Sequence, residues 1–178
     1  VTLADGRAAL EGTITVPLVK GTKLEDVKYT ARGVLSGVKL ENLVPEKTIA
    51  SDALQLLVAD SRISISGPGR IGTVPFEGEW TRAIGAGSGG ASQVNGTIEL
   101  SERLIDEFNI GLPSGTLSGA GQASVTVDLA KGAVPALSLS SNLRGVAMRI
   151  PELGWRKSAK TAGKLALSGR LGDQPVID

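Results

Sequence analysis

The stretch Ala123-Ser-Val-Thr-Val-Asp-Leu129 decides the fold class of this chain. Apolar residues stand at every second position, and Ser, Thr and Asp stand between them. Because successive side chains of a β-strand point to opposite faces, a period of two predicts a strand with one apolar and one polar face. The same alternation recurs at residues 10–18, 27–32, 54–58, 62–66, 74–80, 94–100, 137–143 and 165–171. The sequence therefore predicts an all-β protein.

The composition indicates what kind of surface these strands present. Of the 178 residues, 41% are hydrophobic but only 3% are aromatic, and 24 are glycines. Amphipathic strands can pack as a β-sandwich, or they can form one curved sheet whose apolar face lines an open groove. Alternation alone does not separate these two folds. The scarcity of aromatic residues and the small residues of Gly119-Ala-Gly-Gln-Ala123 favour a smooth aliphatic lining. We expect an elongated, curved, repeat-like antiparallel sheet with an open apolar groove, and keep a β-sandwich as the alternative.

Two stretches of sequence suggest how the chain is organised. The Gly/Ser-rich residues 85–93 predict a flexible loop between a first β-groove segment, residues 1–84, and a second, residues 94–178. Within the second segment a short helix is expected near residues 101–109. Ser101 can cap that helix, and the apolar side chains fall on one helical face: Leu104, Ile105 and Phe108. A weak internal repeat at residues 31–56, 95–127 and 142–167 suggests repeated supersecondary units.

The ionisable residues argue against several functional classes. Nineteen Lys and Arg against 18 Asp and Glu leave a net charge of +1, spread along the chain, whereas a nucleic-acid-binding protein carries a basic patch. We interpret the one local basic cluster, Arg156-Lys157 with Lys160, as a solvated loop. The chain has no Cys and no His, which removes thiol nucleophiles, disulfides and most zinc sites. We expect no nucleic-acid partner, no metal and no cofactor.

The remaining catalytic candidates are weak. Glu77 and Glu79 share a strand face, but glycosidases place their two carboxylates across a cleft, so a solvent-facing strand edge explains this pair better. Residues 85–90 lack the Lys-Ser/Thr ending of a P-loop, and Gly67-Pro-Gly69 lacks the spacing of a dinucleotide fingerprint. Asn95-Gly-Thr97 matches a glycosylation sequon but also suits a turn that enters a strand, and we favour the turn. We therefore predict that the protein is not an enzyme.

The chain contains no apolar run that approaches the roughly 20 residues needed to span a bilayer. It begins at Val1 without a Met or a signal segment, and it ends at Asp178 in what reads as mid-domain sequence. We expect it to be an excised segment whose targeting signal and membrane anchor lie outside it.

One stretch of the chain resembles a known family. The residues Leu143-Arg-Gly-Val-Ala-Met-Arg-Ile-Pro-Glu-Leu-Gly-Trp-Arg-Lys157, followed by Ala162-Gly-Lys-Leu165, resemble a recurring element of AsmA-like proteins. The similarity is closest to the YhdP/TamB-type members of Gram-negative envelopes. The strand, helix and strand expected over residues 94–121 are similar in style. The resemblance covers the second half of the chain, and the first half shares only the pattern.

The resemblance implies a fold and a function. Such proteins are anchored in the inner membrane by an N-terminal helix and cross the periplasm as a long, curved β-groove that conducts phospholipids towards the outer membrane. The implied partners are a phospholipid or other acyl-chain lipid, the inner membrane and envelope proteins, and no catalytic residue is implied. The alternative is a structural or interaction β-sandwich or β-solenoid of an envelope protein without lipid cargo. The lipid-binding groove lining implied by the resemblance is Ile14, Val16, Val27, Tyr29, Ile63, Ile65, Val94, Ile98, Val125, Val127, Leu137, Leu139, Leu165 and Leu167.

Overall fold

The computed structural model describes residues 3–21, 23, 26–59, 61–85, 88–171 and 176–177, and these form an all-β protein, as predicted. Helix α1 (Glu102–Glu107) and the 3-10 helix η2 (Pro151–Leu153) interrupt the strand order. The strands are β1 (Leu3–Thr15), β2 (Lys28–Val44), β3 (Lys47–Ala59), β4 (Arg62–Ile71), β5 (Val74–Ala83), β6 (Ser92–Ser101), β7 (Leu117–Leu129), β8 (Ala136–Ser141), β9 (Val146–Ile150), β10 (Trp155–Lys157), β11 (Leu165–Arg170) and β12 (Val176–Ile177).

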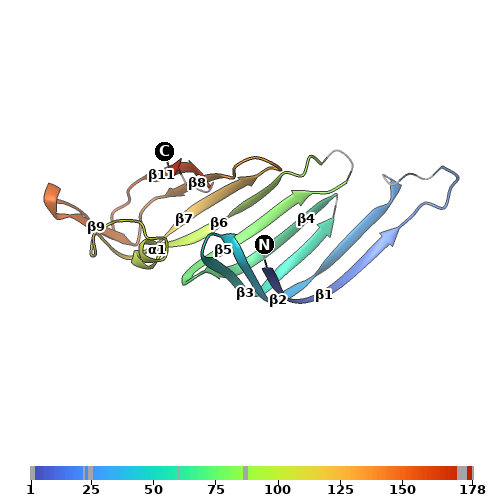
Figure 1. Cartoon of the computed structure of the whole chain (residues 1–178), viewed down its shortest axis with the longest axis horizontal. Coiled ribbons are helices and arrows are strands. Elements are labelled where there is room, and N and C mark those ends of the chain that lie inside the picture. Colours follow the sequence, from blue (N-terminus) through green and yellow to red (C-terminus); the bar gives the residue numbers. More distant parts are fainter. Residues whose placement is uncertain are drawn as a thin grey trace.

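These strands form one open antiparallel sheet. Its order is β1-β2-β3-β4-β5-β6-β7-β8-β11-β12, and the β9–β10 pair branches from β7. Figure 1 shows a single elongated, twisted layer in which the long strands lie side by side. All described strands belong to this one sheet, so no second sheet of described residues packs against it. The prediction of an open sheet is confirmed, and the β-sandwich alternative is wrong.

Short turns explain why the chain forms a meander. Two-residue turns at residues 45–46 and 72–73 join β2 to β3 and β4 to β5. Such a turn places the next strand directly beside the previous one, so the chain cannot cross back over the sheet. β5 and β6 also pair directly, from Phe76 opposite Ile98 to Arg82 opposite Ser92. The sheet is therefore continuous across the Gly/Ser-rich loop that lies between these two strands.

The strands turn at two opposite ends of the sheet. We call these ends the helix end and the loop end. The helix end carries the turns at 45–46 and 72–73, helix α1, and the arm formed by β9, η2 and β10. The loop end carries the connections at 84–91 and 130–135. A small core of buried described residues lies at the helix end, and its members come from the sheet, from α1 and from the base of the arm: Val74, Leu100, Leu104, Leu117, Ala123, Leu143 and Val146.

Helix α1 covers the sheet with the face predicted from sequence. Leu104 is buried, and Ile105 and Phe108 pack against the core. The prediction that Ser101 caps this helix is wrong. The Ser101 hydroxyl lies 2.6 Å from Glu99 Oε1 and makes no capping hydrogen bond. Packing of three apolar side chains, rather than a cap, therefore holds this short helix.

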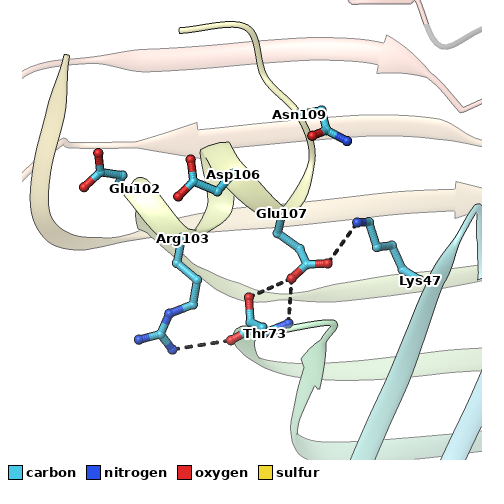
Figure 2. A pocket seen from close by; sticks show the side chains of 7 residues that line it. All are labelled: Lys47, Thr73, Glu102, Arg103, Asp106, Glu107 and Asn109. Atoms are coloured by element: carbon cyan, nitrogen blue, oxygen red, sulfur yellow. Dashed lines mark hydrogen bonds and ion pairs between the residues drawn. The ribbon is translucent and has the colours of Figure 1, made fainter. Parts of the chain in front are cut away.

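The carboxylate of Glu107 fastens α1 to two turns of the sheet (Figure 2). Glu107 Oε2 accepts hydrogen bonds from the Thr73 backbone N–H at 2.9 Å and from Thr73 Oγ1 at 2.7 Å. Glu107 Oε1 lies 2.9 Å from Lys47 Nζ, and both side chains are largely buried, with exposed fractions of 14% for Glu107 and 21% for Lys47. One carboxylate thus joins the β2–β3 turn, the β4–β5 turn and the helix. We call this arrangement the Glu107 junction.

The junction changes the protonation of its central group. The hydrogen bond from the Thr73 side chain, the contact with Lys47 and the Thr73 backbone N–H together lower the pKa of Glu107 from 4.5 to about 2. Because the folded chain holds the charged form more strongly than the unfolded chain does, the junction stabilises the fold fully above the unfolded pKa. That stabilisation is lost as the pH falls through the folded pKa.

Replacing Glu107 by Gln should lower the melting temperature at neutral pH, because the ion pair with Lys47 is lost. The difference between wild type and E107Q should narrow as the pH falls from about 4.5 towards about 2, where the wild-type carboxylate becomes protonated. Thermal melts followed by circular dichroism across this pH range measure the difference in melting temperature. Glu102→Gln is the matched control, since Glu102 is an exposed carboxylate on the same helix. A melting difference that stays constant through this range would contradict the junction.

Substituting Gly72 should disturb the same junction from the side of the sheet. Gly72 has a φ of +57°, and a Cβ at this position would collide with the Glu107 carboxylate. The left-handed conformation alone costs a non-glycine residue about 1–2 kcal/mol. Gly72→Ala should therefore lower the free energy of unfolding by at least this amount, measured by urea denaturation. Gly132→Ala is the control, because Gly132 has a φ of +74° and no atom within 4 Å of an added Cβ. Equal losses in both variants would show that the carboxylate contact contributes nothing.

Candidate functional site

One row of mostly apolar side chains crosses the sheet from β1 to β11 on a single face. Directly opposed residues in antiparallel strands point to the same face. The register makes each residue of this row the direct partner of the next, and the row is Leu10, Gly33, Leu56, Ile65, Trp80, Val94, Val127, Leu137 and Gly169. We call the face that carries it the apolar face.

A second row runs beside the first on the same face and dips in the middle. It passes through Gly67, Gly78 and Gly96, which are direct partners on β4, β5 and β6. Val125, Leu139 and Leu167 continue it across β7, β8 and β11. The three glycines have no side chains, so nothing projects from the second row on β4, β5 and β6 at these positions. We call this strip of three glycines the trough.

The residues expected to line the groove mostly share this face. Twelve of the fourteen are placed on it by strand register. Val16 and Val27 lie just outside β1 and β2, so no strand register assigns them to a face. The twelve residues that the register brings together are Ile14, Tyr29, Ile63, Ile65, Val94, Ile98, Val125, Val127, Leu137, Leu139, Leu165 and Leu167. Their contact with lipid stays a prediction.

The apolar face is covered only at the helix end. Ile98, Leu139 and Leu165 pack against the core beneath α1 and the base of the arm. Away from that core, every described residue of the first row except Gly169 is at least partly exposed, and the exposed fraction rises to 56% at Leu10. Side chains of this kind normally pack under a second layer of structure. Here the described part of the chain supplies no such layer over the centre and the loop end.

The opposite face of the sheet is mostly polar, although Leu57 is exposed on it. On β6 and β7 a hydrogen-bonded network joins Gln93 to Asp128 at 2.6 Å, Asn95 to Gln93 at 2.6 Å and Thr126 to Asn95 at 2.9 Å. Glu77 and Glu79 also lie on this face and are exposed, but β5 is a central strand, so the prediction of a strand edge is wrong. The sheet thus offers one face to water and the other to apolar groups.

Sequence reasoning missed several large members of the apolar face, four of them on β1, β3 and β5. Leu10, Leu56, Phe76 and Trp80 stand on it but were not among the expected lining residues. All four lie at apolar positions of the alternating pattern, which was the signal that could have found them. Trp80 is the most useful of these residues, because it lies half-buried at the centre of the first row and is intrinsically fluorescent.

A second candidate site is a polar cavity of about 470 Å³ beside α1 (Figure 2). Its lining includes the Glu107 junction, together with Arg103, whose guanidinium lies 3.4 Å from the Thr73 carbonyl oxygen. The junction groups satisfy one another, and the described residues contain no cluster of three or more carboxylates able to hold a metal ion. We assign this cavity to the anchoring of α1.

The size of the first row decides what it could hold. Nine strands at a spacing of about 4.8 Å give it a length of about 38 Å. One leaflet of a bilayer has a hydrocarbon depth of about 15 Å, half the thickness of the hydrocarbon core. The row is therefore long enough for more than one acyl chain.

None of the helices in the described residues is long and apolar enough to cross a membrane. No family model, curated protein or solved structure matches this chain.

Proposed function

We propose that this chain is a lipid-binding segment whose apolar face holds the acyl chains of phospholipids. The observation that carries this proposal is the continuous row from Leu10 to Leu137, which remains uncovered along most of its length. An acyl chain supplies the apolar layer that the fold lacks, while the head group stays in water beyond the edge of the trough. The chain itself needs no catalytic group for this role.

The proposed mechanism is movement along a uniform track. Each methylene that leaves water for the apolar face gains about 0.8 kcal/mol, so the face binds a tail through many small contributions. Apart from Gly33, Trp80 and Gly169, the positions on the row carry similar aliphatic side chains. A bound tail therefore exchanges one set of contacts for an equivalent set as it shifts by one strand, and the barrier to sliding stays low.

We further propose that the segment belongs to an AsmA-like lipid bridge. In that role the sheet would continue into neighbouring segments through its edge strands, and phospholipid would travel across the periplasm between the inner and outer membranes. The anchor in the inner membrane would lie in a part of the protein outside this sequence. The sequence resemblance and the open, one-sided sheet support this proposal together.

An interaction module without lipid cargo is the alternative function. In that case another protein, rather than an acyl chain, would cover the apolar face. The two functions differ in what lies against Trp80 in the isolated chain, so fluorescence from this residue separates them.

Phospholipids with brominated acyl chains should quench Trp80, because bromine quenches tryptophan only at close range. Trp155→Phe leaves Trp80 as the single tryptophan. The purified chain is loaded with brominated phosphatidylcholine and freed from vesicles by gel filtration before its emission is measured. Lipid that co-elutes with the protein and quenches Trp80 supports the groove.

The matched control is Trp80→Phe, which leaves only Trp155 on the arm. Lipid in the trough should quench Trp155 far less than Trp80. If the chain retains no lipid, or if only Trp155 is quenched, the lipid-binding proposal is refuted and the interaction module is favoured.

A charge placed in the first row should expel the lipid. Leu137→Asp puts a carboxylate between Val127 and Gly169 on the apolar face. Burying an unpaired charge under an acyl chain costs several kcal/mol, so retained lipid should fall by at least about tenfold. Mass spectrometry of lipid extracted from the purified proteins gives the ratio of lipid retained by the variant to lipid retained by the wild type. Ser138→Asp is the control, since the next residue along β8 carries the same charge on the polar face; equal losses in both variants would refute a one-sided track.

A further inference from the structure

The arm formed by β9, η2 and β10 projects from the helix end of the sheet, away from the long strands (Figure 1). β9 is held to β7 by three register pairs, from Leu117 opposite Met148 to Gly119 opposite Val146. β10 pairs only with β9 among the described strands. The outer half of the arm therefore has no layer of the sheet beneath it.

One side of the arm is apolar. Its side chains are buried near the base of the arm and exposed towards the tip. Met148 packs against the core at the base of the arm. Ile150 and Trp155 are direct partners on the same side, but Trp155 is 46% exposed, and Leu153 at the tip is 75% exposed. A tryptophan beside aliphatic residues at an exposed tip is the arrangement that favours the interface between lipid and water.

The other side of the arm carries an arginine pair. Arg149 and Arg156 are directly opposed across the two strands, and both are exposed. Like charges in this position repel each other. Neither makes an ion pair with a described residue. An external anion that lies between the two guanidinium groups would remove this repulsion.

Lys157 has a different role from the one expected of a solvated basic loop. Its ammonium group donates to the carbonyl oxygens of Leu143 at 2.6 Å and Val146 at 2.8 Å. These bonds tie β10 to the base of β9 and fix the direction in which the arm points. The part of the basic cluster that faces solvent on the arm is therefore the arginine pair.

The charge of the chain is concentrated near the arm. Residues 144–164 contain six Lys and Arg and a single Glu, which gives this segment a net charge of +5. The whole chain has a net charge of +1, so the rest of the chain carries −4. An anionic surface would therefore attract the arm and repel the remainder, which orients the molecule with its helix end towards that surface.

We propose that the arm docks on an anionic phospholipid bilayer, with Leu153 and Trp155 in the interface and the guanidinium groups of Arg149 and Arg156 on lipid phosphates. Arginine suits this role because its planar fork of donors matches phosphate oxygens. The exposed apolar tip favours a bilayer over an acidic protein or a nucleic acid, neither of which offers hydrocarbon at the same depth. This docking goes beyond the proposed groove and does not require it.

The test uses the Trp80→Phe chain, in which Trp155 reports on the arm. Vesicles of phosphatidylcholine alone, and vesicles with phosphatidylglycerol added, are mixed with the protein and separated by flotation. We expect the chain to float with the anionic vesicles only, and the emission of Trp155 to shift to the blue as it enters the interface. Floating without a blue shift, or equal floating with both kinds of vesicle, would overturn the proposal.

Two variants separate the parts of the arm. Arg149→Ser with Arg156→Ser should lower the partition coefficient on anionic vesicles by about thirtyfold, the effect of two cations near such a surface. Arg62→Ser with Arg170→Ser removes the same charge from the polar face of the sheet and should leave binding nearly unchanged. Leu153→Ser should weaken binding and reduce the blue shift. Equal losses in the two double variants would show that charge alone, and not the arm, drives association.

This test is independent of the groove. Made in the Trp155→Phe chain, the arginine variants should retain the lipid that quenches Trp80, because that lipid lies on the sheet. A chain that holds lipid in the groove but does not float would refute only the docking proposal. A chain that floats but retains no groove lipid would refute only the proposed groove.

Discussion

The structure depends on the strand register that keeps one row of apolar side chains on one face of an unclosed sheet. A slip of a single residue in any strand would turn its apolar set to the polar side, because the side-chain period of a strand is two. The register therefore has to hold from Leu10 on β1 to Leu137 on β8 without a second layer to enforce it. The two-residue turns at 45–46 and 72–73 fix it locally, and the Glu107 junction ties both turns to α1.

The same arrangement leaves the fold short of buried apolar area. Its buried core has seven members, all at the helix end, while the remaining apolar side chains shield one another only from the side. A larger hydrophobic layer over the row would stabilise the sheet further. Binding of an apolar ligand and stability of the fold are therefore linked, because any molecule that covers the face of the folded sheet, and cannot do so in the unfolded chain, stabilises the folded state.

Alternation in the sequence was enough to predict the strands and to place residues such as Val94 and Val127 on one face, since that result needs only a period of two. It was not enough to choose between an open sheet and a sandwich, because both bury the same stripe. The contacts that stabilise the helix end could not be predicted from the sequence either. Glu107 meets Thr73 and Lys47 only after the meander has brought residues 34 and 60 positions apart in sequence together. The opposed arginines of the arm required the β9–β10 register, which no local pattern reveals.

The lengths of the connections explain why this sheet stays open and why it is covered at one end. A chain can lay a second layer on its own sheet only through connections long enough to leave the plane, and the turns between β2 and β3 and between β4 and β5 are too short for that. The two long connections at the helix end, residues 102–116 and 142–164, are the ones that leave the plane. The first supplies α1, and the second supplies the arm and Leu143 of the core. Both arise at the helix end, so the fold covers its apolar face there. The covered helix end and the basic arm therefore both follow from these two long connections of the meander.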